Sequence, residues 1–197
     1  ACVGGWELPG EPFTVAEGSK FGWWRARMVG GRTNHWGRIS LRFGPNDFRR
    51  KSLDGLGDDW PISYDDLAPY YLVDDLIGIF CSAECLPNEP DGHFLPAPRP
   101  RCYELLVKQA CDTLKVACIP ARLSILTQPL GNRPACHYCG QCNRGCAVNA
   151  NFSSTNVLLP PAMATGRLTM ITNAMAREVT LGSNGLADGV TYVDKAT

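Results

Sequence analysis

The chain has 197 residues, 45% of them hydrophobic and 19% charged, which is ordinary for a globular protein with one sizeable core, or one domain with a smaller lobe. Its 19 basic and 19 acidic residues give no net charge and form no run of one sign. This excludes the main electrostatic reason to expect a nucleic acid or an anionic membrane as partner, and uncharged apolar runs are too short for a transmembrane segment.

The first informative stretch is a glycine pair followed by polar residues, MVGGRTNHWG, after a segment at residues 1–22 that we expect to be irregular. We call residues 30–37 the Gly-Gly loop. Flexible glycine backbone beside several hydrogen-bond donors is typical of a loop that binds a phosphate or a flat polar cofactor. A plain turn with a buried histidine has the same pattern, so this stretch alone leaves both interpretations open. The loop consists of Gly30, Gly31, Arg32, Thr33, Asn34, His35, Trp36 and Gly37.

Two helices are predicted in the middle of the chain. Ser63 and Asp66 form a capping box at the start of an amphipathic pattern, and Pro69 predicts a kink or an irregular first turn. After a proline-rich loop at residues 81–100, a second helix is expected over residues 101–115, where apolar residues recur at helical spacing.

The last part of the chain predicts a short helix and several strands. Residues 121–128 favour a short strand, and Ser153 or Ser154 is expected to cap a helix that ends at Gly166. From residue 168 onward the pattern favours two or three strands with a turn at residues 184–185. Together these elements indicate an α/β fold class, with α+β elements.

Four of the ten cysteines lie in one stretch, PACHYCGQCNRGCAVN at residues 134–149, which we call the cysteine loop. The spacing C-x2-C-x2-C-x3-C matches a run that binds iron–sulfur clusters in bacterial ferredoxins, and two glycines provide backbone freedom for wrapping a cluster. A zinc site is an alternative, although a second C-x2-C knuckle is absent. Disulfides or simply packed thiols are another. The candidate metal ligands are Cys136, Cys139, Cys142 and Cys146.

The other six cysteines are scattered in apolar or helical surroundings, where we expect buried free thiols that pack as small hydrophobic groups. This weakly favours a reducing compartment. They are Cys2, Cys81, Cys85, Cys102, Cys111 and Cys118.

Several motifs in a fixed order resemble the glucose–methanol–choline (GMC) family of FAD-dependent oxidoreductases. The first are GGRTNHWGR, LRFGPNDF and DWPISYDDLAPYY, followed by CHYCGQCNRGC, LLPPAMATG and LTMITNAMAREVTLGSNGLADGVTYVD. The resemblance is to the bacterial dehydrogenase branch that acts on sugars, sugar acids and related alcohols. It covers nearly the whole chain from residue 23 onward, and the order of the motifs makes it more specific than any one of them.

The resemblance implies a partial FAD-binding, Rossmann-like domain with part of the GMC substrate lobe. Residues 1–60 would be a FAD-binding segment with the flavin loop, residues 61–150 a substrate-lobe segment with the cysteine loop, and residues 151–197 a FAD-binding segment with strands near the adenine. The Gly-Gly loop would lie against the flavin, and the backbone of Ala176 would contact the adenine. In some relatives a histidine at the position of His35 is covalently joined to the flavin.

The family's GxGxxG motif and its catalytic histidine have no counterpart here, so we expect an internal fragment that is inactive alone, with the catalytic residues outside this chain. The implied reaction of the intact protein is oxidation of an alcohol group of a sugar, sugar acid or polyol by hydride transfer to FAD. Electrons would pass to a cytochrome or quinone rather than oxygen, through an iron–sulfur cluster in some relatives.

Two rival hypotheses follow from the cysteines. One is a small iron–sulfur or metal-binding electron-transfer module, and the other is a disulfide-stapled structural protein. The sequence leaves the compartment open between cytoplasm and periplasm.

Overall fold

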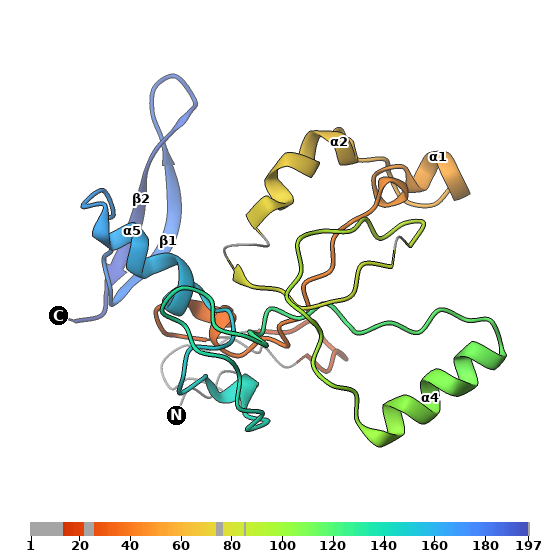
Figure 1. Cartoon of the computed structure of the whole chain (residues 1–197). Helices are drawn as coiled ribbons and strands as arrows, with labels where there is room; N and C mark the ends of the chain where they lie inside the picture. The colour runs from red at the N-terminus through yellow and green to blue at the C-terminus, as the bar shows by residue number, and fades with distance from the viewer. Residues whose placement is uncertain (1–13, 22–25, 74–76, 85, 197) are drawn as a thin grey trace. The chain divides into compact units, whose positions relative to one another are not determined.

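The computed structural model describes residues 14–21, 26–73, 77–84 and 86–196 (Figure 1). The chain forms two compact units, residues 1–159 and 160–197. The three-part division into residues 1–60, 61–150 and 151–197 stays a prediction. None of the helices in the described ranges is long and apolar enough to cross a bilayer.

The capping box at Ser63 is confirmed. Ser63 Oγ accepts a hydrogen bond from Asp66 N at 3.4 Å, and the Asp66 carboxylate accepts one from Ser63 N at 2.7 Å, at the start of helix α2 (Tyr64–Leu67). The helix then tightens into the 3-10 helix η3 (Ala68–Val73) just before Pro69. Proline has no N–H to donate to the preceding turn, which explains why the α-helix stops there.

The second predicted helix is α4 (Cys102–Thr113). It begins with Glu104 Oε2 accepting from Arg101 N at 2.6 Å. It ends in a Schellman turn, in which Val116 N donates to Cys111 O at 2.9 Å around Lys115, whose φ is +56°. None of its residues is buried within the chain.

The remaining helical segments are short. They are the 3-10 helices η1 (Gly31–Asn34), η2 (Pro45–Phe48) and η4 (Cys142–Arg144), the helix α1 (Arg50–Asp54), and a π-helical turn η5 (Ser154–Leu158) that continues as α5 (Leu159–Ala164). Ser153 caps η5 by accepting from Asn156 N at 3.2 Å, and Gly166 ends the helix with φ +67°, so both predicted boundaries are confirmed.

The second unit carries the predicted strands. β1 (Ala174–Leu181) pairs antiparallel with β2 (Ala187–Asp194) around the turn at residues 184–185, as the long twisted hairpin in Figure 1 shows. Mixed helix and strand content is therefore confirmed. A Rossmann-like parallel sheet is not confirmed. In the described ranges this hairpin is the one sheet, and the strand–helix–strand crossover that joins parallel strands is absent.

The core of the first unit is built from short segments that exchange backbone hydrogen bonds. The predicted strand at residues 121–128 contributes isolated β-bridges here rather than a continuous strand. It lies between residues 38–40 and 150–152. The bonds are Ser40 N to Arg122 O (2.9 Å), Ser124 N to Arg38 O (2.9 Å), Phe152 N to Ser124 O (2.9 Å), Leu126 N to Ala150 O (2.8 Å) and Phe80 N to Leu123 O (3.1 Å).

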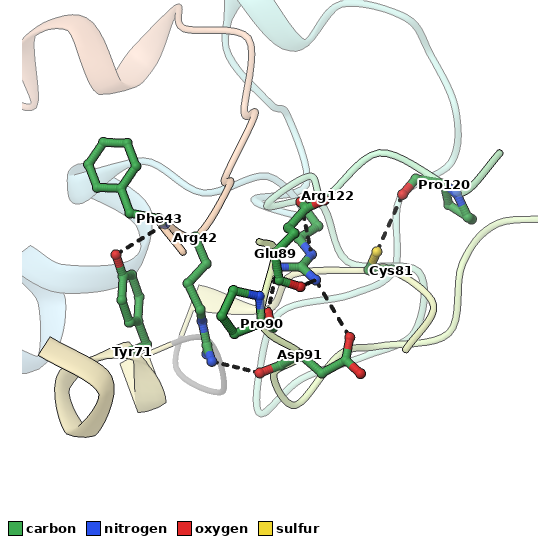
Figure 2. A network of polar contacts seen from close by, with 9 residues as sticks. All are labelled: Arg42, Phe43, Tyr71, Cys81, Glu89, Pro90, Asp91, Pro120 and Arg122. Atoms are coloured by element: carbon green, nitrogen blue, oxygen red, sulfur yellow. Dashed lines mark hydrogen bonds and ion pairs between the residues drawn. The ribbon is translucent and has the colours of Figure 1, made fainter. Parts of the chain in front are cut away.

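Arg122 attaches the proline-rich loop to this core (Figure 2). Its side chain is 2% exposed and donates to Pro90 O at 2.8 Å and to Glu89 O at 3.1 Å. The carboxylates of Glu89 and Asp91 lie 3.4 and 3.6 Å from the guanidinium, whose carbon lies 4.7 Å from the centre of the Phe94 ring. A segment without helices or strands is thereby held by a buried cation, and Arg42 adds a second contact by donating to Asp91 O at 2.6 Å.

Replacing Arg122 with Met should lower the free energy of unfolding by about 2–4 kcal/mol, because two carbonyls and two partly buried carboxylates lose their partner. Urea unfolding measures this change. Arg99→Met is the control, since Arg99 is exposed on the same loop and should change stability by no more than about 0.5 kcal/mol. Equal effects of the two substitutions would contradict the role of Arg122.

Candidate functional site

The Gly-Gly loop folds as the 3-10 turn η1, entered through Gly30 in the left-handed region at φ +88°. A Cβ on Gly30 would also lie 2.7 Å from Asn34 Nδ2 and 2.9 Å from Thr155 Cγ2. Glycine is therefore required at this position both by the backbone angle and by the close approach of residue 155.

One face of the loop packs against residues 153–155, which follow it by more than one hundred positions. Thr33 Oγ1 accepts from Ser154 N at 3.0 Å and lies 2.9 Å from Ser154 Oγ. Thr155 Oγ1 donates to Asn34 Oδ1 at 2.7 Å. The side chains of Thr33 and Asn34, which the sequence suggested as donors to a ligand, are thus used to hold the loop in place.

The loop has open space at Gly31. A Cβ on Gly31, whose φ is +50°, would meet no atom within 4 Å. Four residues further on, the Nε2 atom of His35 is inaccessible to solvent and has no hydrogen-bond partner among the residues that the structure describes. Bare glycine backbone and an unsatisfied ring nitrogen fit a flat polar group such as the flavin ring, because such a group can approach the backbone closely and offer a partner to the nitrogen.

Trp36 closes the loop by contact with Phe152. Its Nε1 donates to Phe152 O at 3.2 Å, and the two rings meet edge to face with centres 6.0 Å apart. Gly37 is exposed, as is Arg32.

Behind the loop lies Arg38, which has no exposed surface and a positive φ of +65°. Its guanidinium donates to Asn34 O at 3.1 Å, to Trp36 O and to Cys142 O at 2.8 Å. With the amide oxygen of Asn151 turned toward it, that oxygen accepts from Arg38 Nε at 3.2 Å. Burial lowers the pKa of Arg38, but an arginine stays protonated in proteins.

The cysteine loop is closed at the buried residue Leu126. Leu126 O accepts from Cys136 N at 2.8 Å, and Leu126 N donates to Ala150 O at 2.8 Å, so both ends of the loop meet there. Arg133, 8% exposed, braces it by donating to Asn149 O at 3.1 Å. Two buried guanidinium groups, those of Arg38 and Arg133, therefore flank this loop.

The predicted metal site is not supported. Among the described residues, no group of three or more His, Cys, Asp or Glu side chains is placed to hold a metal ion. The cysteines interact instead with their own backbone: Tyr138 N donates to Cys136 Sγ at 3.3 Å. The described cysteines are free thiols, so the disulfide alternative has no support either; Cys2 and Cys85 lie outside the described residues.

The thiols of this loop differ in acidity. Burial raises the pKa of Cys142, as do the charges of neighbouring thiolates, and Arg38 opposes them. Burial also raises the pKa of Cys146, but the backbone N–H groups of residues 148–151 outweigh it and lower the pKa below its ordinary value. Convergent backbone N–H groups stabilise an anion, which explains the shift.

Ala176 lies on β1 in the second unit, opposite Tyr192 and just before a register shift in the hairpin. Its predicted contact with adenine stays a prediction, as do the flavin contacts of the Gly-Gly loop. Sequence reasoning missed three residues that shape the site: Arg38, Asn151 and Thr155. Ser153 and Ser154 were named as alternative helix caps, but the contact of Ser154 with Thr33 was not foreseen.

Comparison with known proteins gives one family. The model of the GMC oxidoreductase family matches residues 105–197. The chain is 32% identical over 174 residues to 2-methyl-1,2-propanediol dehydrogenase of Mycolicibacterium austroafricanum, covering 86% of this chain and 31% of that protein. It is 28% identical over 197 residues to paromamine 6'-oxidase of Streptomyces fradiae, covering 98% of this chain and 34% of that protein.

A further similarity is to the fructose dehydrogenase large subunit of Gluconobacter japonicus, at 30% identity over 130 residues, or 64% of this chain and 24% of that protein. The chain spans about a third of the length of the first two relatives.

The two glycines of the loop offer a matched pair of substitutions. Gly30→Ala should destabilise the protein by about 2–4 kcal/mol, from backbone strain and a clash with Thr155. Gly31→Ala should cost only about 1–2 kcal/mol, because strain is its single penalty. Urea unfolding midpoints of both variants test this, and a larger loss for Gly31→Ala would contradict the packing described here.

Alkylation should distinguish the two acidities in the cysteine loop. Thiolates react and thiols do not, so the rate at Cys146 should reach half its maximum at a lower pH than an ordinary cysteine, and the rate at Cys142 at a higher pH. Iodoacetamide labelling followed by peptide mass spectrometry gives both profiles. In guanidinium chloride the profiles should coincide; the reverse order in the folded protein would refute the assignment.

Proposed function

Because this chain belongs to the glucose–methanol–choline oxidoreductase family, we propose that it is part of a longer FAD-dependent enzyme that oxidises an alcohol group of a sugar, sugar acid or similar polyol. FAD, when bound, supplies the acceptor for the hydride that leaves the alcohol carbon. The catalytic base would lie outside this chain, and no residue here is assigned that role.

The observation that carries the proposal is the two-sided construction of the Gly-Gly loop. Its inner face is fixed by Thr33 and Asn34 against residues 154 and 155, and its outer face presents bare backbone at Gly31. We assign Gly31 to close contact with the flavin ring and His35 to its neighbourhood, where the buried Nε2 would reach the ring only after the imidazole turns outward. Such a rigid, open backbone surface binds a planar group without loss of loop entropy.

For the electron acceptor we propose a quinone or cytochrome rather than oxygen. Two of the relatives are named as dehydrogenases, which supports this, and two others are named as oxidases. The substrate class follows the same names, which include a diol and a sugar. Because the four cysteines form no metal-binding group in the described residues, the route from flavin to acceptor is proposed without a cluster.

The test is the visible absorption of the purified full-length protein. We expect two resolved flavin bands, which an alcohol or sugar substrate bleaches under anaerobic conditions and which a quinone restores faster than oxygen does. Gly31→Val should lose most of the flavin, because a branched side chain would occupy the open face.

A colourless protein would overturn the FAD assignment. A broad absorption shoulder that reduction bleaches, without flavin bands, would favour the iron–sulfur module instead. Fast recovery with oxygen alone would overturn only the choice of acceptor.

A further inference from the structure

Arg38 connects the Gly-Gly loop to the cysteine loop, where its acceptor Cys142 lies 104 residues away in the chain, and within the described part of the chain no ion pair to a carboxylate is found for it. The guanidinium is fully buried, and its acceptors are backbone carbonyls and the Asn151 amide. Removing a cation from water is costly unless its N–H groups are all matched by acceptors. The buried charge is therefore tolerated only while the surrounding carbonyls keep their positions.

The acceptors belong to different parts of the site. Asn34 O and Trp36 O lie on the Gly-Gly loop, and Cys142 O lies on the cysteine loop. The planar fork of an arginine fixes the directions of its N–H groups, so one side chain imposes a mutual geometry on the three carbonyls. A lysine has a single ammonium group and cannot reproduce this arrangement.

We propose that Arg38 is a positioning residue that makes the conformation of the Gly-Gly loop depend on that of the cysteine loop. Displacing the backbone at Cys142 moves an acceptor of the guanidinium and loosens the carbonyls of Asn34 and Trp36. The consequence for flavin binding rests on the function proposed above, but the coupling between the loops does not.

Hydrogen exchange of the full-length protein without FAD tests the coupling directly. The amides of Thr33 and His35 are hydrogen-bonded within the loop and that of Gly31 to Met28 O just before it, so they report its integrity. Arg38→Gln should speed exchange about tenfold or more in peptides covering residues 30–37 and also residues 142–150, with Arg38→Lys intermediate. Exchange at the hydrogen-bonded amides of Phe80, Cys81 and Leu95, which lie in the same unit but outside both loops, should be unchanged, which shows that this unit remains folded.

Arg144→Gln is the control for charge removal. Arg144 is exposed on the cysteine loop, and its substitution should leave exchange at residues 30–37 as it is in the native protein. Acceleration by Arg38→Gln in only one of the two loops would overturn the proposal, as would equal acceleration by Arg144→Gln.

A second pair of variants tests the coupling without removing the arginine. Gly145 has φ +92° and open space around it, so Gly145→Ala strains only the backbone of the cysteine loop. It should speed exchange at residues 30–37 in the native background and add nothing in the Arg38→Gln background. Gly185→Ala imposes the same kind of strain in the hairpin turn, at φ +73°. It should leave hydrogen exchange at residues 30–37 unchanged. Additive effects of Gly145→Ala and Arg38→Gln would overturn the proposal.

FAD titration of the same variants separates the two proposals. If the native protein binds FAD, Arg38→Gln and Gly145→Ala should each weaken the affinity about tenfold, and Arg144→Gln should not. If the exchange results hold and the native protein binds no FAD, the proposed function fails while the coupling stands. Unchanged FAD affinity in Arg38→Gln would refute the role in flavin binding.

Discussion

A guanidinium without access to solvent needs an acceptor for its N–H groups, and Arg38 meets this need with carbonyls from the Gly-Gly loop and the cysteine loop. Arg122 and Arg133 follow the same principle with carbonyls of the proline-rich loop and of residues 149 and 151. In a unit with few long helices or strands, these cations provide the hydrogen bonds between distant segments that a β-sheet provides in other proteins. They satisfy the polar groups of irregular backbone and hold distant segments in register.

This construction explains why the candidate site is made of loops and is still well defined. Side chains of the Gly-Gly loop hydrogen-bond to Ser154 and Thr155, and the carbonyl of Asn34 accepts from Arg38. The backbone at Gly31 is the part that retains open space for a ligand. The side chains of Thr33 and Asn34 hold the scaffold. In the function proposed here, the backbone at Gly31 contacts the ligand.

The cysteine loop has a different meaning in the structure than in the sequence. Its spacing suggested an iron–sulfur cluster, but no three of the described thiols are placed to hold a metal ion, and those of Cys136 and Cys146 accept hydrogen bonds from their local backbone. What the loop contributes to the site is the carbonyl of Cys142, a backbone group that no residue-type pattern can identify.

The sequence by itself determined the local elements: the Ser63 cap, helix α4, the Ser153 cap, the Gly166 stop and the hairpin turn at residues 184–185. These depend on hydrogen bonds and backbone angles within a few residues, and the order of the motifs was enough to identify the GMC family. Only the tertiary structure decided that Arg38 is buried, that Thr33 and Asn34 face residues 154 and 155, and that no three of the described thiols are placed to hold a metal ion. Each of these depends on contacts between segments about one hundred residues apart or on the exact path of a loop, which spacing and composition do not encode.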